Sequence, residues 1–326
     1  MVFRGKLSFY FKINMTEHYV TFFDRLYLPQ GLALHMSMER QFQNFKLWIV
    51  CMDEEVHDAL SKIGPKNVEL LKISDVETEE LKSVKSSRTK GEYCWTITPF
   101  TPKFVFDADQ SISRVTYVDA DLWFRKDPTA IFEEFENSGK SVLITDHAYA
   151  PEYDLSDTFG QFCVQFMVFV RDESEMVREW WADRCLEWCF NRLEDGKFGD
   201  QKYLDDWNVL FKDQVHVLRN KELALAPWNV SRFPFGNSVF FHFHGVRLLS
   251  RNKIHLGVYK IPKIVFEKIY ASYFIDLKSA MNSLKKHGYG INRQMRFLDV
   301  LKTPVKKVLK LFDILRLDNL FTIKNL

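Results

Sequence analysis

The most informative segment of the sequence is residues 114–123, which read RVTYVDADLW. The run Val115–Asp119 has the β-branched and aromatic composition of a strand, and Asp119 and Asp121 follow at its end, two residues apart. In an open α/β sheet, ligands bind outside the carboxyl ends of the strands. Alternate residues of an extended chain point the same way, so the two carboxylates would form an oxygen-rich site suited to Mg²⁺ or Mn²⁺. The alternative is an exposed turn, because Asp-x-Asp occurs in many loops.

Around this segment, short apolar runs alternate with helical patterns, as in βα units built around a largely parallel sheet. A helix is predicted over Leu28–Phe42, and the clearest helical pattern is Glu173–Leu193, with Asp172 as its N-cap. Several early strands are continuous apolar runs, which fits strands covered on both faces. The sequence therefore predicts an α/β protein with a mixed, mostly parallel sheet flanked by helices. Its predicted strands are Tyr19–Phe23, Leu47–Met52, Val68–Ile73, Val115–Asp119, Val142–Thr145, Val164–Val170, Val215–Leu218 and Val239–Phe243.

The composition is that of a packed globular protein. Hydrophobic residues make up 46% of the 326 residues, with only 13 Gly and 10 Pro, which argues against a disordered or fibrous chain. The longest apolar runs, such as Val164–Val170, are too short to span a bilayer. No secretory signal pattern follows the N-terminus, and the five cysteines are scattered, so we expect reduced thiols in a cytoplasmic protein.

Charge divides the chain into two parts. Residues 253–326 carry 15 Lys/Arg against 5 Asp/Glu, whereas residues 1–252 carry 30 against 38. We expect a catalytic domain over 1–252 and a basic, helical C-terminal extension over 253–326. Within it, Val305–Arg316 is amphipathic, with apolar residues on one face and Lys306, Lys307, Lys310 and Arg316 on the other. Such a helix can lie on an anionic membrane surface, or it can dock on its own domain or a partner.

A second group of polar side chains lies in residues 240–245, FFHFHG. Alternation along a strand would place His242 and His244 on one face. Imidazole binds Mn²⁺ well beside carboxylates and is a less natural ligand of Mg²⁺. Gly245 would let the backbone approach a phosphate closely. The alternative is a strand with two partly exposed histidines.

Three further features have a structural and a functional interpretation. In Gly199-Asp200-Gln201 the chain turns into a helix, and Asp200 either caps that helix or faces a ligand. The loop Ala226-Pro227-Trp228-Asn229 offers an aromatic face and an amide to a sugar or base, or else packs Trp228 in the core. Cys185 and Cys189 are four residues apart, but without further ligands nearby we expect buried packing rather than a metal site.

Taken in this order, the segments resemble those of GT-A glycosyltransferases, most closely glycosyltransferase family 8 and related bacterial surface-polysaccharide transferases. Members of that family have an apolar strand ending in a DxD metal motif, a DQ pair at a helix start and a late HFxG motif. The counterparts are Tyr117–Asp121, Asp200-Gln201 and His242–Gly245, and the resemblance covers roughly residues 17 to 250. It implies a GT-A fold, a Rossmann-like domain that binds nucleotide-diphospho-sugars.

The resemblance also implies roles for particular residues. Asp119, Asp121 and His242 would bind Mn²⁺ (or Mg²⁺), which bridges the donor diphosphate. Asp200 and Gln201 would be the catalytic pair beside the transferred sugar. The segment Arg88–Thr98 would lie near the donor. The residues implied to line the donor and metal site are Thr21, Phe22, Asp24, Arg88, Tyr117, Asp119, Ala120, Asp121, Asp146, Trp228 and Gly245.

By the same resemblance, the reaction is metal-dependent and retaining. A nucleoside diphosphate sugar, with UDP-sugar favoured, would donate to a hydroxyl of a glycan or lipid-linked glycan. The basic tail would then hold a cytoplasmic enzyme of polysaccharide biosynthesis at the inner face of the membrane. One segment departs from the family pattern, because Cys163-Val164-Gln165 replaces Asn-x-Gly. The sugar is therefore not implied, and Gln165 is a candidate substitute for the missing amide.

Other functions fit the sequence less well. A metal-dependent nucleotidyltransferase or phosphohydrolase also uses Asp-x-Asp, but the sequence lacks a Gly-rich phosphate loop and further clustered acids. A non-catalytic sugar-binding relic of the fold is a second alternative, although Asp119, Asp121 and His242 are all intact. No nucleic acid partner is expected, because the basic residues lack interleaved aromatics or a recognised motif.

Overall fold

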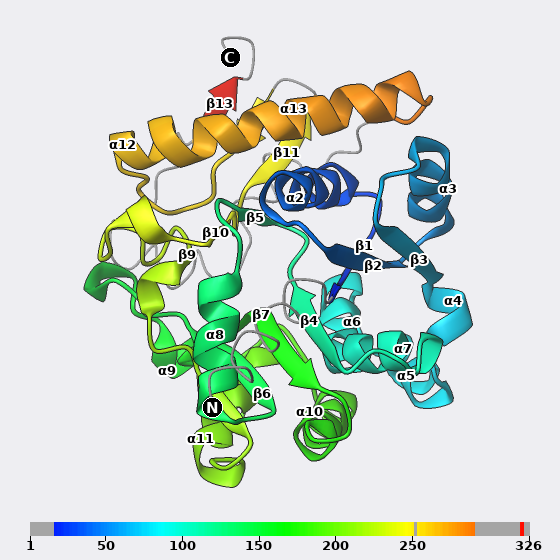
Figure 1. Cartoon of the computed structure of the whole chain (residues 1–326), viewed down its shortest axis with the longest axis vertical. Helices are drawn as coiled ribbons and strands as arrows, with labels where there is room; N and C mark the ends of the chain where they lie inside the picture. The colour runs from blue at the N-terminus through cyan, green and yellow to red at the C-terminus, as the bar shows by residue number, and fades with distance from the viewer. Residues whose placement is uncertain (1–15, 251–252, 291–319, 323–326) are drawn as a thin grey trace, which may run out of the picture.

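We analysed a computed structural model of the chain, which describes residues 16–250, 253–290 and 320–322 (Figure 1). A central sheet has the strand order β3-β2-β1-β4-β7-β6-β8. All its pairings are parallel except those of β7, which runs antiparallel to both β4 and β6. The strands are β1 (Glu17–Phe23), β2 (Phe45–Cys51), β3 (Val68–Lys72), β4 (Arg114–Val118), β6 (Val142–Asp146), β7 (Phe162–Val170) and β8 (Val215–Val217).

These strands confirm the predicted α/β class and the mixed, mostly parallel sheet. Each predicted strand is present with its ends shifted by only one or two residues, and the last of them is β10 (Phe240–His242). That strand belongs to a small sheet with β5 (Leu122–Phe124) and β9 (Ala224–Leu225). A third sheet joins β11 (Arg247–Ser250), β12 (Lys253–His255) and β13 (Leu320–Thr322).

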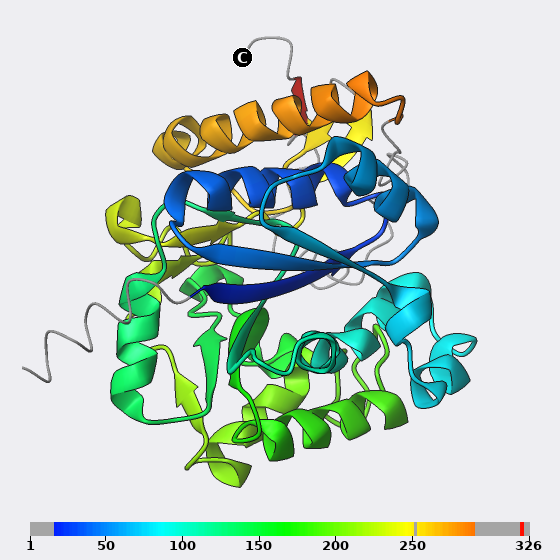
Figure 2. The same cartoon turned by 45° about the vertical axis from the view of Figure 1, so that its right-hand side comes forward.

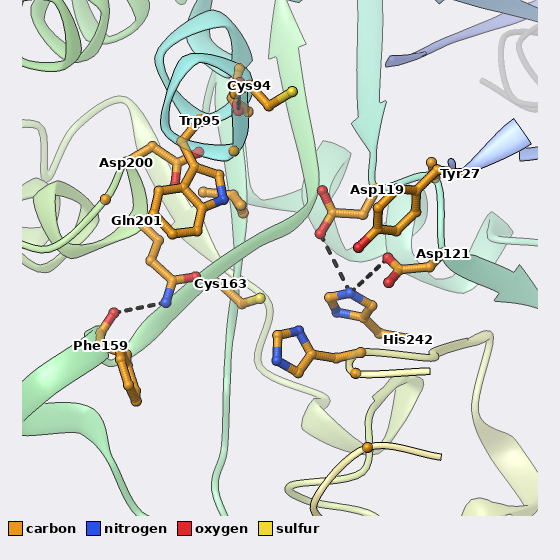
Figure 3. Close-up of a pocket in the computed structure, with 18 of the residues that line it drawn as sticks. Tyr27, Cys94, Trp95, Asp119, Asp121, Phe159, Cys163, Asp200, Gln201 and His242 are labelled. Carbon is orange, nitrogen blue, oxygen red and sulfur yellow. Dashed lines mark hydrogen bonds and ion pairs between the residues drawn. The ribbon is translucent and has the colours of Figure 1, made fainter. Parts of the chain in front are cut away.

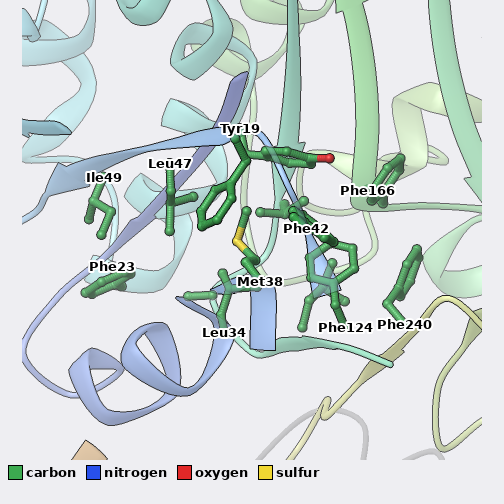
Figure 4. Close-up of a cluster of buried hydrophobic side chains, with 14 of the residues drawn as sticks. Tyr19, Phe23, Leu34, Met38, Phe42, Leu47, Ile49, Phe124, Phe166 and Phe240 are labelled. Atoms are coloured by element: carbon green, nitrogen blue, oxygen red, sulfur yellow. The ribbon is translucent and has the colours of Figure 1, made fainter. Parts of the chain in front are cut away.

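Helices cover both faces of the central sheet (Figures 1 and 2). Alternation along β1 shows this directly, because Tyr19 and Phe23 belong to one buried cluster and Val20 to the other. Helices α2, α3 and α8 contribute to the first cluster, part of which is drawn in Figure 4, and α6, α7 and α10 to the second. The helices are α2 (Leu28–Gln41), α3 (Glu54–Ile63), α4 (Ile73–Val76), α5 (Glu79–Lys85), α6 (Lys90–Ile97), α7 (Thr101–Ala108), α8 (Thr129–Ser138), α9 (Ser156–Phe159), α10 (Glu175–Glu187), α11 (Trp207–Leu210), α12 (Lys263–Val265) and α13 (Ala271–Lys286).

The predicted helix over Glu173–Leu193 was too long, and its predicted N-cap was wrong. Helix α10 spans Glu175–Glu187, with Ser174 at the N-cap position, whereas Asp172 has a φ of 60° in the turn that follows β7. The helix ends at Trp188, which is extended and accepts a 2.8 Å hydrogen bond from the Tyr203 hydroxyl at its carbonyl oxygen. This tertiary contact outweighs the helical periodicity that continues in the sequence.

The described part of the basic extension packs on the body of the molecule. Helix α13 lies along α2 (Figure 2), and its Asp276 accepts hydrogen bonds from Trp123 Nε1 (2.6 Å) and Arg40 Nη1 (2.9 Å). The amphipathic segment 305–316 lies outside the described residues, and the domain boundary between 252 and 253 stays a prediction. Among the described helices, none combines the length and the apolarity that crossing a bilayer requires.

Candidate active site

Strand pairing brings Asp119, Asp121 and His242 together. Asp119 follows β4, and its N–H donates to Gln165 O on β7 (3.0 Å). Asp121 immediately precedes β5, whose Leu122 pairs with His242 on β10. The N–H of Phe243 then donates to Asp121 O (2.9 Å). The backbone register therefore places the late histidine opposite the acidic motif, although about 120 residues separate them in the chain.

The side chains of these three residues point at one another (Figure 3). His242 Nε2 lies 3.1 Å from Asp121 Oδ1 and 3.6 Å from Asp119 Oδ2. The Tyr117 hydroxyl donates to Asp119 Oδ1 (2.7 Å), which holds that carboxylate in place. One ligand atom from each of Asp119, Asp121 and His242 lies within 4.8 Å of the others. The predicted metal-binding trio is thus assembled in space.

Burial and mutual charge set the protonation of the trio. Burial alone would raise the pKa of Asp121, but the charge and hydrogen bond of His242 lower it to about 2. Burial alone would lower the pKa of His242, and Asp121 and Asp119 raise it instead. Burial raises the pKa of Asp119. The two carboxyl groups therefore favour the protonated form of the His242 imidazole.

This arrangement fits a divalent cation. Two carboxylates and one imidazole form a donor set suited to Mn²⁺. The predicted Cys185/Cys189 pair differs. Both cysteines are buried, and among the described residues they belong to no group of three candidate ligands. All five cysteines of the chain are free thiols.

A cavity of about 610 Å³ opens beside the trio. Its wall contains most of the residues that the sequence singled out, drawn from segments far apart in the chain. These are Phe22, Asp24, Tyr117, Asp119, Ala120, Asp121, Asp200, Gln201, Trp228, His242 and Gly245. The Lys90–Thr98 part of the predicted donor segment also lines it, through Lys90, Gly91, Cys94, Trp95 and Thr98.

Asp200 and Gln201 lie across the cavity from the trio (Figure 3). Asp200 is only 3% exposed, precedes the 3-10 helix Gln201–Asp206 and makes no side-chain capping hydrogen bond, so the capping role is not seen. Its Oδ2 is buried and has no hydrogen-bond partner among the residues that the structure describes. Burial, reinforced by the charge of Asp119, raises the pKa of Asp200 to about 7. Gln201 Nε2 donates to Phe159 O (2.9 Å), which fixes the amide against the wall.

Trp228 is both a packing residue and part of the cavity wall. It is 3% exposed, its Nε1 donates to His147 O (2.8 Å), and its ring meets those of His242 and His244 edge-on. Gly245 has a φ of 82°, and a Cβ there would lie 3.2 Å from Gly257 Cα. Contact with Gly257 and the left-handed backbone therefore already require glycine at this position.

Three predicted contact residues do not line the cavity. Thr21 is fully buried within β1. Arg88 donates to Leu186 O (3.1 Å) and lies over the Phe190 ring. Asp146 pairs with Lys221, Nζ to Oδ2 at 2.6 Å. Contacts within the protein thus hold the side chains of Arg88 and Asp146, and Thr21 is enclosed in the sheet.

Several residues of the wall gave no signal in the sequence. Tyr27, Tyr149, Arg247 and Tyr259 line the cavity, and Arg247 lies over the Tyr27 ring at 5.2 Å. They are single residues in loops or at element ends, so no periodicity or motif marks them. Arg247 follows Gly245 by two residues, whereas Tyr259 follows it by 14.

Comparison with known sequences and structures adds a family and a fold. No family model matches the chain. YfnF of Bacillus subtilis (strain 168) is 34% identical over 260 residues, which cover 74% of this chain and 85% of YfnF. YfnD of the same organism is 26% identical over 287 residues, covering 83% of this chain and 91% of YfnD.

Among solved structures, the apo form of mouse xyloside xylosyltransferase 1 has a TM-score of 0.50 and 14% identity, covering 71% of this chain and 98% of that one. The bifunctional glycosyltransferase WbbM also has a TM-score of 0.50 and 14% identity, covering 86% of this chain and 52% of that one. At such low identity the likeness shows the fold, and membership of glycosyltransferase family 8 stays a prediction. The chain belongs to the same family as YfnF, and its fold is that of the GT-A glycosyltransferases.

Proposed function

We propose that this protein is a metal-dependent glycosyltransferase that moves a sugar from a nucleoside diphosphate sugar to a hydroxyl acceptor. The observation that carries the proposal is one cavity with the candidate metal-binding trio on one side and the buried carboxylate of Asp200 on the other. A donor bound there would place its diphosphate by Asp119, Asp121 and His242 and its sugar by Asp200 and Gln201. The shared fold with glycosyltransferases supports the same activity.

The protein's own side chains would bind both parts of the donor. Asp119, Asp121 and His242 would hold a divalent metal ion, with Mn²⁺ favoured over Mg²⁺ because of the imidazole. When bound, the ion would neutralise negative charge that develops on the departing diphosphate. Lys90 and Arg247 line the same cavity and would add positive charge for the phosphates.

Asp200 is the group best placed to act on the sugar. In the reaction, the bond from the anomeric carbon to the phosphate oxygen breaks and the acceptor oxygen bonds to that carbon, while the acceptor proton leaves on the phosphate. The sugar becomes cationic as the first bond breaks. Above its pKa of about 7, Asp200 would be an anion that stabilises that cation or attacks it as a weak nucleophile. In the second case the acceptor oxygen would then displace the Asp200 carboxylate from the anomeric carbon. Both roles accord with retention of configuration.

The finer identity of donor and acceptor follows from the resemblance and belongs to the same proposal. We favour a UDP-sugar as donor and a glycan or lipid-linked glycan as acceptor, in the synthesis of a polysaccharide. The basic residues after 252 would hold the enzyme at an anionic membrane surface. Co-sedimentation of the full-length chain with vesicles containing anionic lipid, with neutral vesicles as the control, tests that last point.

A panel of nucleotide-sugars tests the proposed activity. We expect one donor to raise the melting temperature strongly only with Mn²⁺ present, since a ligand that binds the native state stabilises it as the logarithm of its saturation. The same donor should be hydrolysed slowly with Mn²⁺ and not with EDTA. Cleavage of nucleoside triphosphates, with no response to any nucleotide-sugar, would instead identify a nucleotidyltransferase or phosphohydrolase.

A further inference from the structure

Gln165 stands where the glycosyltransferase pattern has glycine, and its side chain contacts the metal-binding histidine. The residue is fully buried on β7 and is absent from the cavity wall. Its Oε1 lies 2.9 Å from His242 Nδ1, and its Nε2 donates to Thr145 Oγ1 at 3.3 Å. Gln165 therefore does not reach a sugar in the cavity, and the expectation of a substitute substrate-binding amide is wrong.

The hydrogen bond between Thr145 and Cys163 fixes which groups donate and which accept around Gln165. The Thr145 hydroxyl donates to Cys163 O (3.3 Å), and a carbonyl oxygen can only accept. Thr145 Oγ1 must therefore accept its other hydrogen bond, which comes from the amide nitrogen of Gln165. This orients the amide so that its oxygen, Oε1, faces His242.

The orientation of the amide then decides which nitrogen of His242 keeps a proton. Oε1 has no hydrogen to give, so His242 Nδ1 must be the donor in this pair. In the neutral ring, Nε2 is then left with its lone pair, and Nε2 is the atom that faces Asp121 and Asp119 at 3.1 and 3.6 Å. The edge-on contact with Trp228 limits rotation of the ring out of this position.

We propose that Gln165 is a positioning residue that fixes the His242 tautomer and ring orientation for metal binding. The inference rests on the proposed metal-dependent function. Asp119 and Asp121 would supply negative charge to the metal ion. The hydrogen bonds that run from Cys163 O through Thr145 and Gln165 would hold the His242 imidazole with the lone pair of Nε2 free to bind it. The buried side chain of Gln165 thus supports the proposed metal site through its contact with His242.

Direct metal binding tests this role. The free Mn²⁺ signal in electron paramagnetic resonance gives the dissociation constant without any catalytic readout. Gln165→Met keeps the length of the side chain and removes the acceptor, and we expect Mn²⁺ to bind about 10- to 100-fold more weakly. Gln165→Glu keeps an acceptor oxygen beside Nδ1, and we expect affinity at least equal to that of the wild type.

A matched control is available in Gln30, another fully buried glutamine, whose amide has no hydrogen-bond partner in the described part of the chain and does not line the cavity. Gln30→Met should bind Mn²⁺ as the wild type does. Equal affinity of Gln165→Met and wild type would overturn the inference, as would an equal loss in Gln30→Met. If Gln165→Met does not fold, Thr145→Val decides: weaker Mn²⁺ binding supports the chain of hydrogen bonds, and unchanged binding overturns it.

The same titration separates this inference from the proposed function. If the wild type binds no Mn²⁺, both fail together. If the wild type binds Mn²⁺ and Asp121→Ala does not, the metal site is real, and Gln165→Met alone decides whether Gln165 positions His242.

Discussion

On one side of the cavity His242 forms ion pairs with Asp119 and Asp121, whereas across it Asp200 is buried and its Oδ2 has no hydrogen-bond partner among the described residues. We call these the metal side and the Asp200 side. On the metal side, burial of charge is compensated within the protein, and the pKa of Asp121 falls to about 2. On the Asp200 side burial outweighs a hydrogen bond with Thr98, and the pKa of Asp200 rises to about 7.

From this difference we expect the metal side to bind the donor and the Asp200 side to act in the chemical step. A site whose charges are already balanced and held by Tyr117 and Gln165 is preorganised, so a ligand that enters it meets fixed side chains. A buried carboxylate without a partner is costly, and such a group is retained where a positive charge appears during turnover. The two sides therefore make different predictions for substitutions of the same residue type.

The largest effect is expected on the metal side. Asp121→Ala removes the carboxylate nearest to His242 and a ligand of the proposed metal, so turnover should fall by at least about 10³-fold and Mn²⁺ binding should be lost. Asp213→Ala, in an exposed loop, is the control and should be unchanged. Steady-state donor hydrolysis at several Mn²⁺ concentrations measures the effect. Activity near that of the wild type in Asp121→Ala would remove the metal side from the mechanism.

On the Asp200 side, turnover and donor binding should separate. Asp200→Asn keeps the shape of the side chain and removes its charge, so we expect a roughly 10²- to 10³-fold lower kcat with donor affinity within a few-fold of the wild type. Asp206→Asn, on the exposed surface of the same 3-10 helix, is the matched control. A loss that falls on donor affinity instead of kcat would show that Asp200 binds the donor and takes no part in the chemical step.

The fold was largely readable from the sequence, whereas the contacts inside the site were only partly so. Continuous apolar runs marked the strands, and two acids at the end of β4 marked the metal side, because both signals are local. The end of α10 at Trp188 was missed because it depends on a contact with Tyr203. The contact of Gln165 with His242 was missed because it depends on the pairing of β7 with β4. Tyr27, at the N-cap of α2, and Arg247, at the start of β11, are far apart in the sequence, and only the folded chain brings them to the cavity.

The two sides should also respond with opposite sign in stability. In the metal-free protein, Asp121→Asn breaks a buried ion pair and should lower the free energy of unfolding by about 3 kcal/mol. Asp200→Asn removes a charge that burial disfavours and should raise the free energy of unfolding by about 1 to 2 kcal/mol at pH 8. Because the folded pKa of Asp200 lies above its unfolded value, the wild type loses stability as pH rises from about 4 to about 7, and the gain in Asp200→Asn should grow over that interval. Chemical denaturation at pH 5 and pH 8 measures the change in free energy of unfolding for both variants. Stabilisation by Asp121→Asn would contradict the proposed difference between the two sides.

The smallest effect is expected at Asp146. The resemblance placed this carboxylate among the residues that line the donor site, whereas the structure pairs it with Lys221 outside the cavity. Asp146→Asn leaves an oxygen for the Ala148 N–H but turns an amide nitrogen toward the Lys221 ammonium group. Since Lys221 is more than a third exposed, water screens the pair, and we expect a loss of only about 1 kcal/mol in unfolding free energy. The donor KM and kcat should stay within about twofold of the wild type, because nothing on either side of the cavity has changed. A large rise in donor KM with an unchanged melting temperature would instead place Asp146 against the sugar, and the Asp200 side would then extend to β6.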